Sequence, residues 1–291
     1  MALPVQPRTI VAGVTVGSIG AGLLVSKLGR DVDADANAPR AVFGRGPAFV
    51  SLPLQCSEQV NHDTKRLRFA LPHEADVSGL SLTSAVLTMS WPQGRWLPAV
   101  RPYTPISAIN EPGVLELLVK QYPDGKQSTH LHSLKPGDKL LFAAAIRGHQ
   151  WVPNSVPHVT LIAGGAGITP IFQLAQGILQ NPDDKTAVTI VYGVNTDEDC
   201  HLTEEFQRFE NEFRDRFRIV YTVSRPDEST TLRKGRVTKK LLEEVAPLPK
   251  GGETKVFVCG PPAMESSLVG TRKEKGILEQ LGYRKDQIHT F

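Results

Sequence analysis

The sequence is poor in cysteine and carries little net charge, and both shortages exclude classes of protein. Its three cysteines, Cys56, Cys200 and Cys259, lie far apart without metal-ligand spacing, which argues against disulfide bonds and a zinc site. The formal net charge of +3 is too small to indicate a nucleic-acid partner. With 40% hydrophobic and 22% charged residues, the 291-residue chain has an ordinary globular composition and is long enough for two domains.

Charge is also absent from the N-terminal run Thr9 to Ser26. About 20 apolar residues can span a bilayer as a helix, and this run just reaches that length, although its glycines make it a weak hydrophobe. Gly13 and Gly17 have the GxxxG-type spacing of packed membrane helices. We therefore expect a membrane anchor or targeting segment at 1–30 and a polar linker at 31–47. A cleaved leader and a disordered tail are the alternatives.

Two regions with different hydrophobic patterns follow the linker. Residues 48–148 contain short apolar runs separated by Pro, Gly and Asp, which predicts an antiparallel β-barrel or sandwich. After a Pro-punctuated linker at 149–157, β-branched runs alternate with helix-like segments over 158–291, which predicts a Rossmann-like α/β domain with a parallel sheet. The expected fold class is therefore β followed by α/β. Parallel sheets bind ligands at the carboxyl ends of their strands.

In the first region, the run RPYTPIS combines three groups that suit a flat, phosphorylated cofactor. Arg101 has a permanent cation whose fork of donors can hold a phosphate, Tyr103 has a planar ring, and Thr104 has a short hydroxyl. Strand alternation would send Arg101 and Tyr103 to one face and Thr104 to the other. Taken alone, the run is equally well explained as a strand end beside a turn.

A second candidate in this region is VKQYPDGKQS, which contains Lys120, Gly125, Lys126 and Ser128. Backbone amides from Gly125 to Ser128 can form an anion-binding nest for a phosphate. A surface hairpin with solvated lysines is the alternative for these residues.

In the second region, the Gly-rich segment GGAGITP runs from Gly164 to Pro170, directly after an expected strand. Glycines let backbone N–H groups approach a pyrophosphate, and a helix N-terminus adds a favourable dipole. The pattern is GxGxxP and not the GxGxxG dinucleotide fingerprint. A strand–helix turn without a ligand remains the alternative.

Two further features stand at expected strand ends. CGPPAM begins at Cys259, where the double proline stops the sheet and the sulfur can lie beside a reactive ring; a buried, structural cysteine is the alternative. Asp199 lies about one βαβ unit beyond the Gly-rich turn. A carboxylate there can bind a ribose 2′-hydroxyl and repel a 2′-phosphate, unless it is an ordinary solvated loop residue.

Together RPYTP, GKxS, GGxGITP and CGPPxM, in this order and spacing, resemble the NADH–cytochrome b5 reductase family of ferredoxin-reductase-like flavoproteins. The resemblance runs from about Ala48 to Phe291, and the closing GILEQLGYRKDQIHTF, with the N-terminal run, looks like the fungal mitochondrial form. It implies an FAD-binding barrel at 48–148 and an NADH domain at 158–291. Hydride would pass from NADH to the flavin, and single electrons to cytochrome b5 or a similar haem protein.

The resemblance also implies roles for individual residues. Thr104, expected near flavin N5, and Cys259, expected beside the nicotinamide, are the implied catalytic residues. Asp199 is the implied selector of NADH over NADPH, and Lys126 is implied in docking cytochrome b5. The residues implied to hold FAD are Arg101, Tyr103, Thr104, Gly125, Lys126 and Ser128. The residues implied to hold NADH are Lys120, Gly165, Gly167, Thr169, Pro170, Asp199, Gly260, Pro261 and Met264.

Two other functions stay open at this point. An NADPH-dependent flavin reductase serving ferredoxin or an oxygenase would share both domains, but basic residues in place of Asp199, which would favour it, are absent. The other is a flavin-free, membrane-anchored scaffold of the same fold. Its support is departure from the family pattern at Ala166, where Thr is usual, at Asp124 and Gln127, where Gly and Met are usual, and at Ala143–Ile146, where a Gly-Pro pair is usual.

We further expect a monomeric catalytic domain that uses FAD and NADH, with no metal and no nucleic-acid partner. The expected location is the mitochondrial outer membrane, through the N-terminal anchor. A processed form in the intermembrane space and the endoplasmic reticulum membrane are the alternatives.

Overall fold

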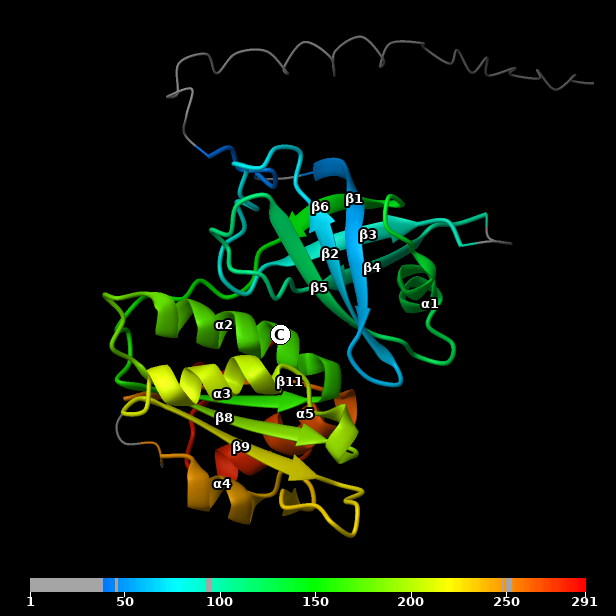
Figure 1. Cartoon of the computed structure of the whole chain (residues 1–291). Helices are drawn as coiled ribbons and strands as arrows, with labels where there is room; N and C mark the ends of the chain where they lie inside the picture. Colours follow the sequence, from blue (N-terminus) through cyan, green and yellow to red (C-terminus); the bar gives the residue numbers. More distant parts are fainter. Residues whose placement is uncertain (1–38, 45–46, 93–95, 248, 250–252) are drawn as a thin grey trace, which may run out of the picture. The chain divides into compact units, whose positions relative to one another are not determined.

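The computed structural model describes residues 39–44, 47–92, 96–247, 249 and 253–291. The expected anchor at 1–30 and the linker up to residue 38 lie outside the described residues. Within the described ranges, no helix is both long and apolar enough to cross a membrane. Residues from Pro39 to Phe291 form one compact unit that contains two sheets (Figure 1).

The first sheet is antiparallel and has the strand order β4-β3-β6-β1-β2-β5. Its strands are β1 (Pro47–Gln59), β2 (Thr64–Ala70), β3 (Ala85–Ser90), β4 (Ala99–Tyr103), β5 (Val114–Lys120) and β6 (Lys139–Ile146). Strand β1 pairs with β6 along its first part and with β2 along its second part, with a register shift between Leu54 and Cys56. It therefore joins the two halves of this sheet.

Alternation along the strands builds the core of the antiparallel sheet. In β2, Leu67 and Phe69 are fully buried while the residues between and beside them are half-buried. The Phe69 ring packs edge-on against Phe142 of β6, with ring centroids 5.2 Å apart. This matches the period-2 pattern from which the antiparallel region was predicted.

The first sheet is a half-barrel, where the sequence predicted an antiparallel β-barrel or sandwich. Among the described strands, the edge strands β4 and β5 do not pair with each other. Helix α1 (Lys126–Ser133) packs against both of them instead. Its buried Gln127 and Leu131 cover the space that direct strand pairing would close.

The second sheet is parallel and has the order β10-β9-β8-β7-β11-β12. Its strands are β7 (His158–Gly164), β8 (Ala187–Val194), β9 (Phe217–Val223), β10 (Arg233–Lys234), β11 (Thr254–Cys259) and β12 (Ile288–Thr290). The strand order reverses between β7 and β11, and such a reversal opens a crevice at the carboxyl ends of the strands. The predicted Rossmann-like domain is therefore present, and its ligand edge is where β7 and β11 end.

Helices cover both faces of the parallel sheet (Figure 1). On one face, α2 (Ile168–Gln180) and α3 (Thr203–Glu212) pack with β7, β8 and β9, and an aromatic cluster joins the two helices, with Phe172 stacked on Phe209 and edge-on to Phe206. On the other face lie α4 (Lys239–Val245), α5 (Pro262–Val269) and α6 (Ile277–Gln280). Burial on both faces explains the continuous apolar runs of these strands.

A polar seam connects the two sheets on one side. The Asn61 side chain, just after β1, donates to the carbonyl oxygen of Glu198 at 2.8 Å. Arg66 of β2 forms an ion pair with Glu205 of α3. The Gln173 side chain of α2 donates to the Pro105 carbonyl oxygen at 3.1 Å. The last of these contacts ties the segment after β4 to α2, the helix that follows the Gly-rich turn.

Candidate functional site

A cavity of about 1370 Å³ lies between the two sheets, lined by residues of both. It exceeds the 300–1,000 Å³ or so of an ordinary ligand pocket, so there is room for more than one ligand. Every residue for which the resemblance implied a catalytic or cofactor-binding role lines this cavity: Arg101, Tyr103, Thr104, Lys120, Gly125, Lys126, Ser128, Gly165, Gly167, Thr169, Pro170, Asp199, Cys259, Gly260, Pro261 and Met264. Their individual roles remain predictions.

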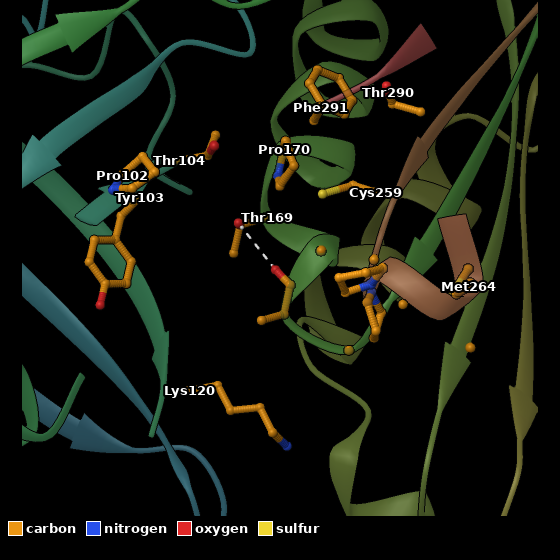
Figure 2. A pocket seen from close by; sticks show the side chains of 18 of the residues that line it. Pro102, Tyr103, Thr104, Lys120, Thr169, Pro170, Cys259, Met264, Thr290 and Phe291 are labelled. Carbon is orange, nitrogen blue, oxygen red and sulfur yellow. Dashed lines mark hydrogen bonds between the residues drawn. The ribbon is translucent and has the colours of Figure 1, made fainter. Parts of the chain in front are cut away.

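On the antiparallel side, the end of β4 supplies Arg101, Tyr103 and Thr104. All three line the cavity, although strand alternation would have sent Thr104 to the opposite face. Strand β4 ends at Tyr103, so the strand period no longer applies at Thr104. Figure 2 shows Thr104 reaching from this strand end toward the side that carries Pro170 and Cys259.

The hydrogen-bonding state of Tyr103 follows from its surroundings. Its ring packs against the core of the antiparallel sheet. Burial raises the pKa of the Tyr103 hydroxyl to about 12, against a smaller lowering effect of Arg101. The hydroxyl therefore keeps its proton near neutral pH and is available as a donor to a neighbouring ligand.

The start of α1 forms a site that suits a phosphate. The helix begins at Lys126 after Gly125, and the first amides of a helix have no intrahelical acceptor. The Ser128 hydroxyl donates to the Gly125 carbonyl oxygen at 3.0 Å and accepts from the Tyr122 amide at 3.3 Å, which fixes the loop before the helix. Together with the positive end of the helix dipole, these amides fit a bound anion.

Two departures from the family pattern lie at this helix start. The Gln127 side chain is buried; it accepts from the Ser90 hydroxyl at 2.5 Å and donates to the Thr88 hydroxyl at 2.9 Å. Gln127 lines the cavity, but its side-chain amide is engaged by Ser90 and Thr88 and is not directed to a phosphate. Asp124 is exposed at the cavity wall, so water can screen its charge from a bound anion.

On the parallel side, the glycines of the turn after β7 serve different purposes. Gly165 has a φ of +50° and open space around its Cβ position, so backbone can face a ligand there without a side chain between. A Cβ on Gly167 would lie 2.6 Å from the Cys259 carbonyl carbon and 2.9 Å from the Gly260 nitrogen. Gly167 is therefore needed for close packing of this turn against the end of β11.

Contacts within the turn hold its shape. The Thr169 hydroxyl donates to the Ala166 carbonyl oxygen at 3.4 Å, drawn as the dashed line in Figure 2. The buried Tyr192 hydroxyl donates to the Gly165 carbonyl oxygen at 3.2 Å. Ala166 contributes no hydroxyl where the family has one, so the backbone and Thr169 supply the polar groups of the turn.

Cys259 stands where β11 ends, beside Pro170 in Figure 2. Burial, and to a lesser degree Glu265, raises the pKa of its thiol to about 12. The sulfur is therefore uncharged at neutral pH and is a poor nucleophile, because the thiolate is the reactive form. It suits a packing contact with a flat ring better than covalent catalysis.

Lys120 and Asp199 form an ion pair between the sheets. Lys120 Nζ lies 2.9 Å from Asp199 Oδ1 and 2.8 Å from Asp63 Oδ2. Asp199 Oδ2 accepts from the Thr196 amide at 3.0 Å and from its hydroxyl at 2.9 Å. Burial works to raise the pKa of Asp199, but the hydrogen bonds from Lys120 and Thr196 outweigh it and lower that pKa. Both carboxylate oxygens are thus engaged by the protein.

The same ion pair explains a cluster that resembles a metal site. His62, Asp63 and Asp199 bring possible ligand atoms within 4.8 Å of one another. The ammonium group of Lys120 already occupies the position between the two carboxylates. The lysine therefore takes the place that a metal cation would need between these carboxylates.

Several residues of the cavity wall were not among the predicted site residues. Asn195 and Ser224 directly follow β8 and β9, and Arg236 lies two residues after β10. Asn195 and Ser224 could have been found by examining the ends of the expected strands. Arg147, Gly148 and His149 follow β6, Thr290 is the last residue of β12, and Phe291 follows it. Nothing in their local sequence marks these last five.

The cavity fits the two cofactors that the sequence implied. Its antiparallel side has a cation, a helix start and a planar ring for a flavin nucleotide, and its parallel side has an open glycine turn at a strand-order reversal for a dinucleotide. Thr104 and Cys259 mark where the two sides face each other.

Comparisons with known proteins agree with this arrangement. The model of the oxidoreductase FAD-binding domain matches residues 51–150, and that of the oxidoreductase NAD-binding domain matches residues 161–269. NADH-cytochrome b5 reductase 2 of Pyricularia oryzae is 45% identical over 260 residues, covering 87% of this chain and 78% of that protein. The protein of the same name from Emericella nidulans is 42% identical over 290 residues, covering 97% and 90%.

Solved structures show the same fold. The cytochrome b5 reductase domain of Ulva prolifera nitrate reductase has a TM-score of 0.74 and 26% identity, covering 86% of this chain and all of that domain. The CS-b5R domains of human Ncb5or have a TM-score of 0.69 and 22% identity, covering 84% and 70%. The resemblance expected from the four motifs is confirmed: the chain belongs to the NADH-cytochrome b5 reductase family of oxidoreductases, which use FAD and NADH.

Proposed function

We propose that this protein takes hydride from NADH and passes single electrons to cytochrome b5 or a closely similar haem protein. The observation that carries the proposal is the single cavity in which Thr104, at the end of the antiparallel β4, faces Pro170 and Cys259 on the parallel side. A flavin held by one sheet and a nicotinamide held by the other would meet there. When bound, FAD supplies the redox chemistry, accepting a hydride and releasing electrons one at a time.

The residues of this chain bind and orient. Arg101 and the amides at the start of α1 would hold the flavin phosphates, and Tyr103 would lie along the flavin ring. The turn around Gly165 would hold the nicotinamide nucleotide. Close packing of Gly167 on β11 keeps this turn at a fixed distance from Cys259. Alignment of two rings within a fraction of an ångström is what such a site contributes to the rate.

Acid–base and nucleophilic roles are not needed from this chain. Cys259 and Tyr103 both hold their protons at neutral pH because burial raises their pKa values to about 12. Tyr103 and Thr104 can therefore act as hydrogen-bond donors to the flavin. Their role is to stabilise charge that develops on the ring when hydride arrives.

Two observations support cytochrome b5 or a similar haem protein as the electron acceptor: the charge of an exposed lysine and the names of the related proteins. Lys126 is exposed at the cavity wall, at the start of α1. A cation there can attract an acidic haem-protein surface and raise the association rate at low ionic strength. The names of the relatives refer to cytochrome b5, which supports this class of acceptor.

The test uses the full-length protein purified with its flavin. Anaerobic NADH should bleach the flavin absorption band, and oxidised cytochrome b5 should then restore it while becoming reduced. A colourless protein would support the scaffold alternative, and a flavin that NADH fails to reduce would defeat the proposed reaction. Reduction by NADH without transfer to cytochrome b5 would leave another acceptor class, such as ferredoxin.

Lys126 is tested by the dependence of the second-order rate with cytochrome b5 on ionic strength. The rate per bound flavin should fall as salt rises, and Lys126→Gln should show a lower rate and a weaker salt dependence. Lys273→Gln is the matched control, because Lys273 is also exposed but lies outside the cavity wall. Equal behaviour of the two variants would remove Lys126 from the docking surface.

We propose further that residues 1–30 anchor the protein in the mitochondrial outer membrane. The support is the uncharged run from Thr9 to Ser26, which is long enough for one helix span. Fusing residues 1–30 to a fluorescent protein, followed by carbonate extraction of mitochondria, tests the proposal. Fluorescence at the endoplasmic reticulum, or release of the fusion by carbonate, would contradict it.

A further inference from the structure

One part of the cavity wall lies away from the place where the two sheets face each other. We name it the outer rim and define it as Asn195, Ser224, Gly235 and Arg236, which follow the ends of β8, β9 and β10. The Ser224 hydroxyl donates to Asn195 Oδ1 at 3.3 Å. Backbone hydrogen bonds from Ser224 to Val194 and from Gly235 to Val223 hold these strand ends together. The outer rim is thus a small polar surface at the sheet edge.

The sheet order says which part of a dinucleotide reaches the outer rim. Under the proposed function, the nicotinamide lies at the ends of β7 and β11, near Cys259. Strands β8, β9 and β10 are successively farther from β7 in the sheet, and the cavity continues along their ends. A dinucleotide extended along this edge therefore places its adenosine ribose at the outer rim.

The outer rim presents no carboxylate to that ribose. Among the described residues, the carboxylates that line the cavity are Asp124 and Asp199. Asp124 stands before α1 on the antiparallel side, and Asp199 has both oxygens engaged by Lys120 and Thr196. The acidic residues of the neighbouring loops, Asp197, Asp227 and Glu228, are outside the cavity wall, and Asp197 accepts a hydrogen bond from Thr230.

The charge at the outer rim is positive instead. Arg236 is exposed, lines the cavity, and makes no ion pair with any residue that the structure describes. Arg233, three residues earlier, pairs with Glu244 at 2.6 Å and does not line the cavity. Arg236 can therefore present its fork of donors to a phosphate, which a guanidinium binds through two parallel hydrogen bonds.

We propose that the outer rim accepts a 2′-phosphate, so that NADPH is oxidised alongside NADH and Arg236 determines the ratio between the two. Sites specific for NADH reject NADPH by placing a carboxylate at the ribose 2′ position, where it repels the phosphate dianion. Here that position has Ser224 and Asn195, which are neutral, beside an arginine. The resemblance implied that Asp199 makes this selection, but both of its carboxylate oxygens are engaged by Lys120 and Thr196, so we place the selection at the outer rim.

The proposal is tested on the full-length, FAD-loaded protein with both nucleotides at low ionic strength. We expect kcat/KM with NADPH to lie within about thirtyfold of the value with NADH. Calorimetric titration with 2′,5′-ADP and with 5′-AMP gives an independent measure, and 2′,5′-ADP should bind more tightly. Its advantage should shrink as salt rises, since the added contact is between charges.

Three variants test whether the outer rim sets the preference between NADH and NADPH. Arg236→Gln should shift the NADH-to-NADPH ratio of kcat/KM about tenfold toward NADH, the size of one charge-assisted contact. Ser224→Asp should shift the ratio in the same direction by repulsion and weaken 2′,5′-ADP relative to 5′-AMP. Arg233→Gln removes the same charge three residues away, outside the cavity, and should leave the ratio unchanged.

The outcomes separate this inference from the function on which it rests. If the protein is active with NADH but its kcat/KM with NADPH is more than about thirtyfold lower, the inference alone is overturned. The inference is also overturned if neither Arg236→Gln nor Ser224→Asp changes the NADH-to-NADPH ratio of kcat/KM. It is overturned as well if Arg233→Gln changes this ratio as much as Arg236→Gln does. Failure of NADH itself to reduce the flavin would instead overturn the proposed function.

Discussion

Replacing Gly167 by alanine would put a methyl group into space that the backbone of β11 already occupies. The new Cβ would lie 2.6 Å from the Cys259 carbonyl carbon and 2.9 Å from the Gly260 nitrogen, whereas ordinary contact begins at 3.4 Å. Gly167 has φ −64° and ψ −4°, a right-handed conformation that alanine adopts freely. The whole effect of the substitution is therefore steric.

The size of the effect follows from these distances. Backbone atoms cannot rotate away as a flexible side chain can, and the nearest of them is the Cys259 carbonyl oxygen, so the turn and the end of β11 must separate by roughly 1 Å to restore ordinary contact. Overpacking of this kind costs about 1–3 kcal/mol of folding free energy, which lowers Tm by roughly 5 °C in a protein of this size. A misplacement of about 1 Å between reacting groups lowers a rate about a hundredfold. We expect kcat with NADH to fall by about ten- to a hundredfold.

The assay measures NADH oxidation with an artificial one-electron acceptor, per bound flavin, together with thermal unfolding by circular dichroism. Gly44→Ala is the control, because the Cβ position of Gly44 has nothing within 4 Å. It should leave both quantities close to the wild-type values. A Gly167→Ala variant with wild-type kcat and Tm would refute the reasoning, since the backbone would then have room that the structure does not show.

Three further predictions concern the ion pair between the sheets and the cysteines. Lys120→Met and Asp199→Asn should each lower the free energy of unfolding. Because the two residues belong to one network, the double variant should lose at least about 0.5 kcal/mol less than the sum of the two single losses. Additive losses in denaturant unfolding would show that the pair contributes no coupling. Hydrogen bonds lower the pKa of Asp199 below 3.8, against the opposing effect of burial, so its stabilisation is present above pH 3.8 and is lost as pH falls further. Asp199→Asn should therefore flatten the acid limb of the plot of Tm against pH, and an unchanged limb would contradict this assignment. At pH 8, iodoacetamide should modify the exposed Cys56 well before Cys259. The pKa of about 12 leaves the Cys259 thiol ionised in about one molecule per ten thousand at this pH. Peptide mass spectrometry that finds Cys259 modified first would contradict this prediction.

The period of the hydrophobic pattern was enough to predict two sheets of different kind. Alternation in segments such as β2, and continuous apolar runs in β7 and β8, follow directly from burial on one face or on both. The convergence of the candidate residues was also predictable, because strand ends of a parallel sheet meet at one edge. This is why Gly165 and Cys259, far apart in the chain, line the same cavity.

What the sequence could not predict depends on tertiary contacts. The half-barrel arises because α1 packs between β4 and β5, and no local signal says whether a helix or a strand pairing fills that gap. The partners of Asp199 are also non-local, since Lys120 is on the other sheet. Gln127 looked like a departure at a phosphate site, but its side chain points into the core toward Ser90 and Thr88.

Strand β1 has a consequence for how the protein is made. Leu52 pairs with Leu140, so the partner of the first half of β1 is synthesised close to ninety residues later. At a translation rate of about 5–20 residues per second, β1 waits on the order of 5–20 s for that partner. During this interval its backbone N–H and C=O groups on the β6 side form an open edge, which is a template for wrong pairing with another chain. The nascent chain is thus most in need of a chaperone before Ile146, the last residue of β6, has emerged from the ribosome.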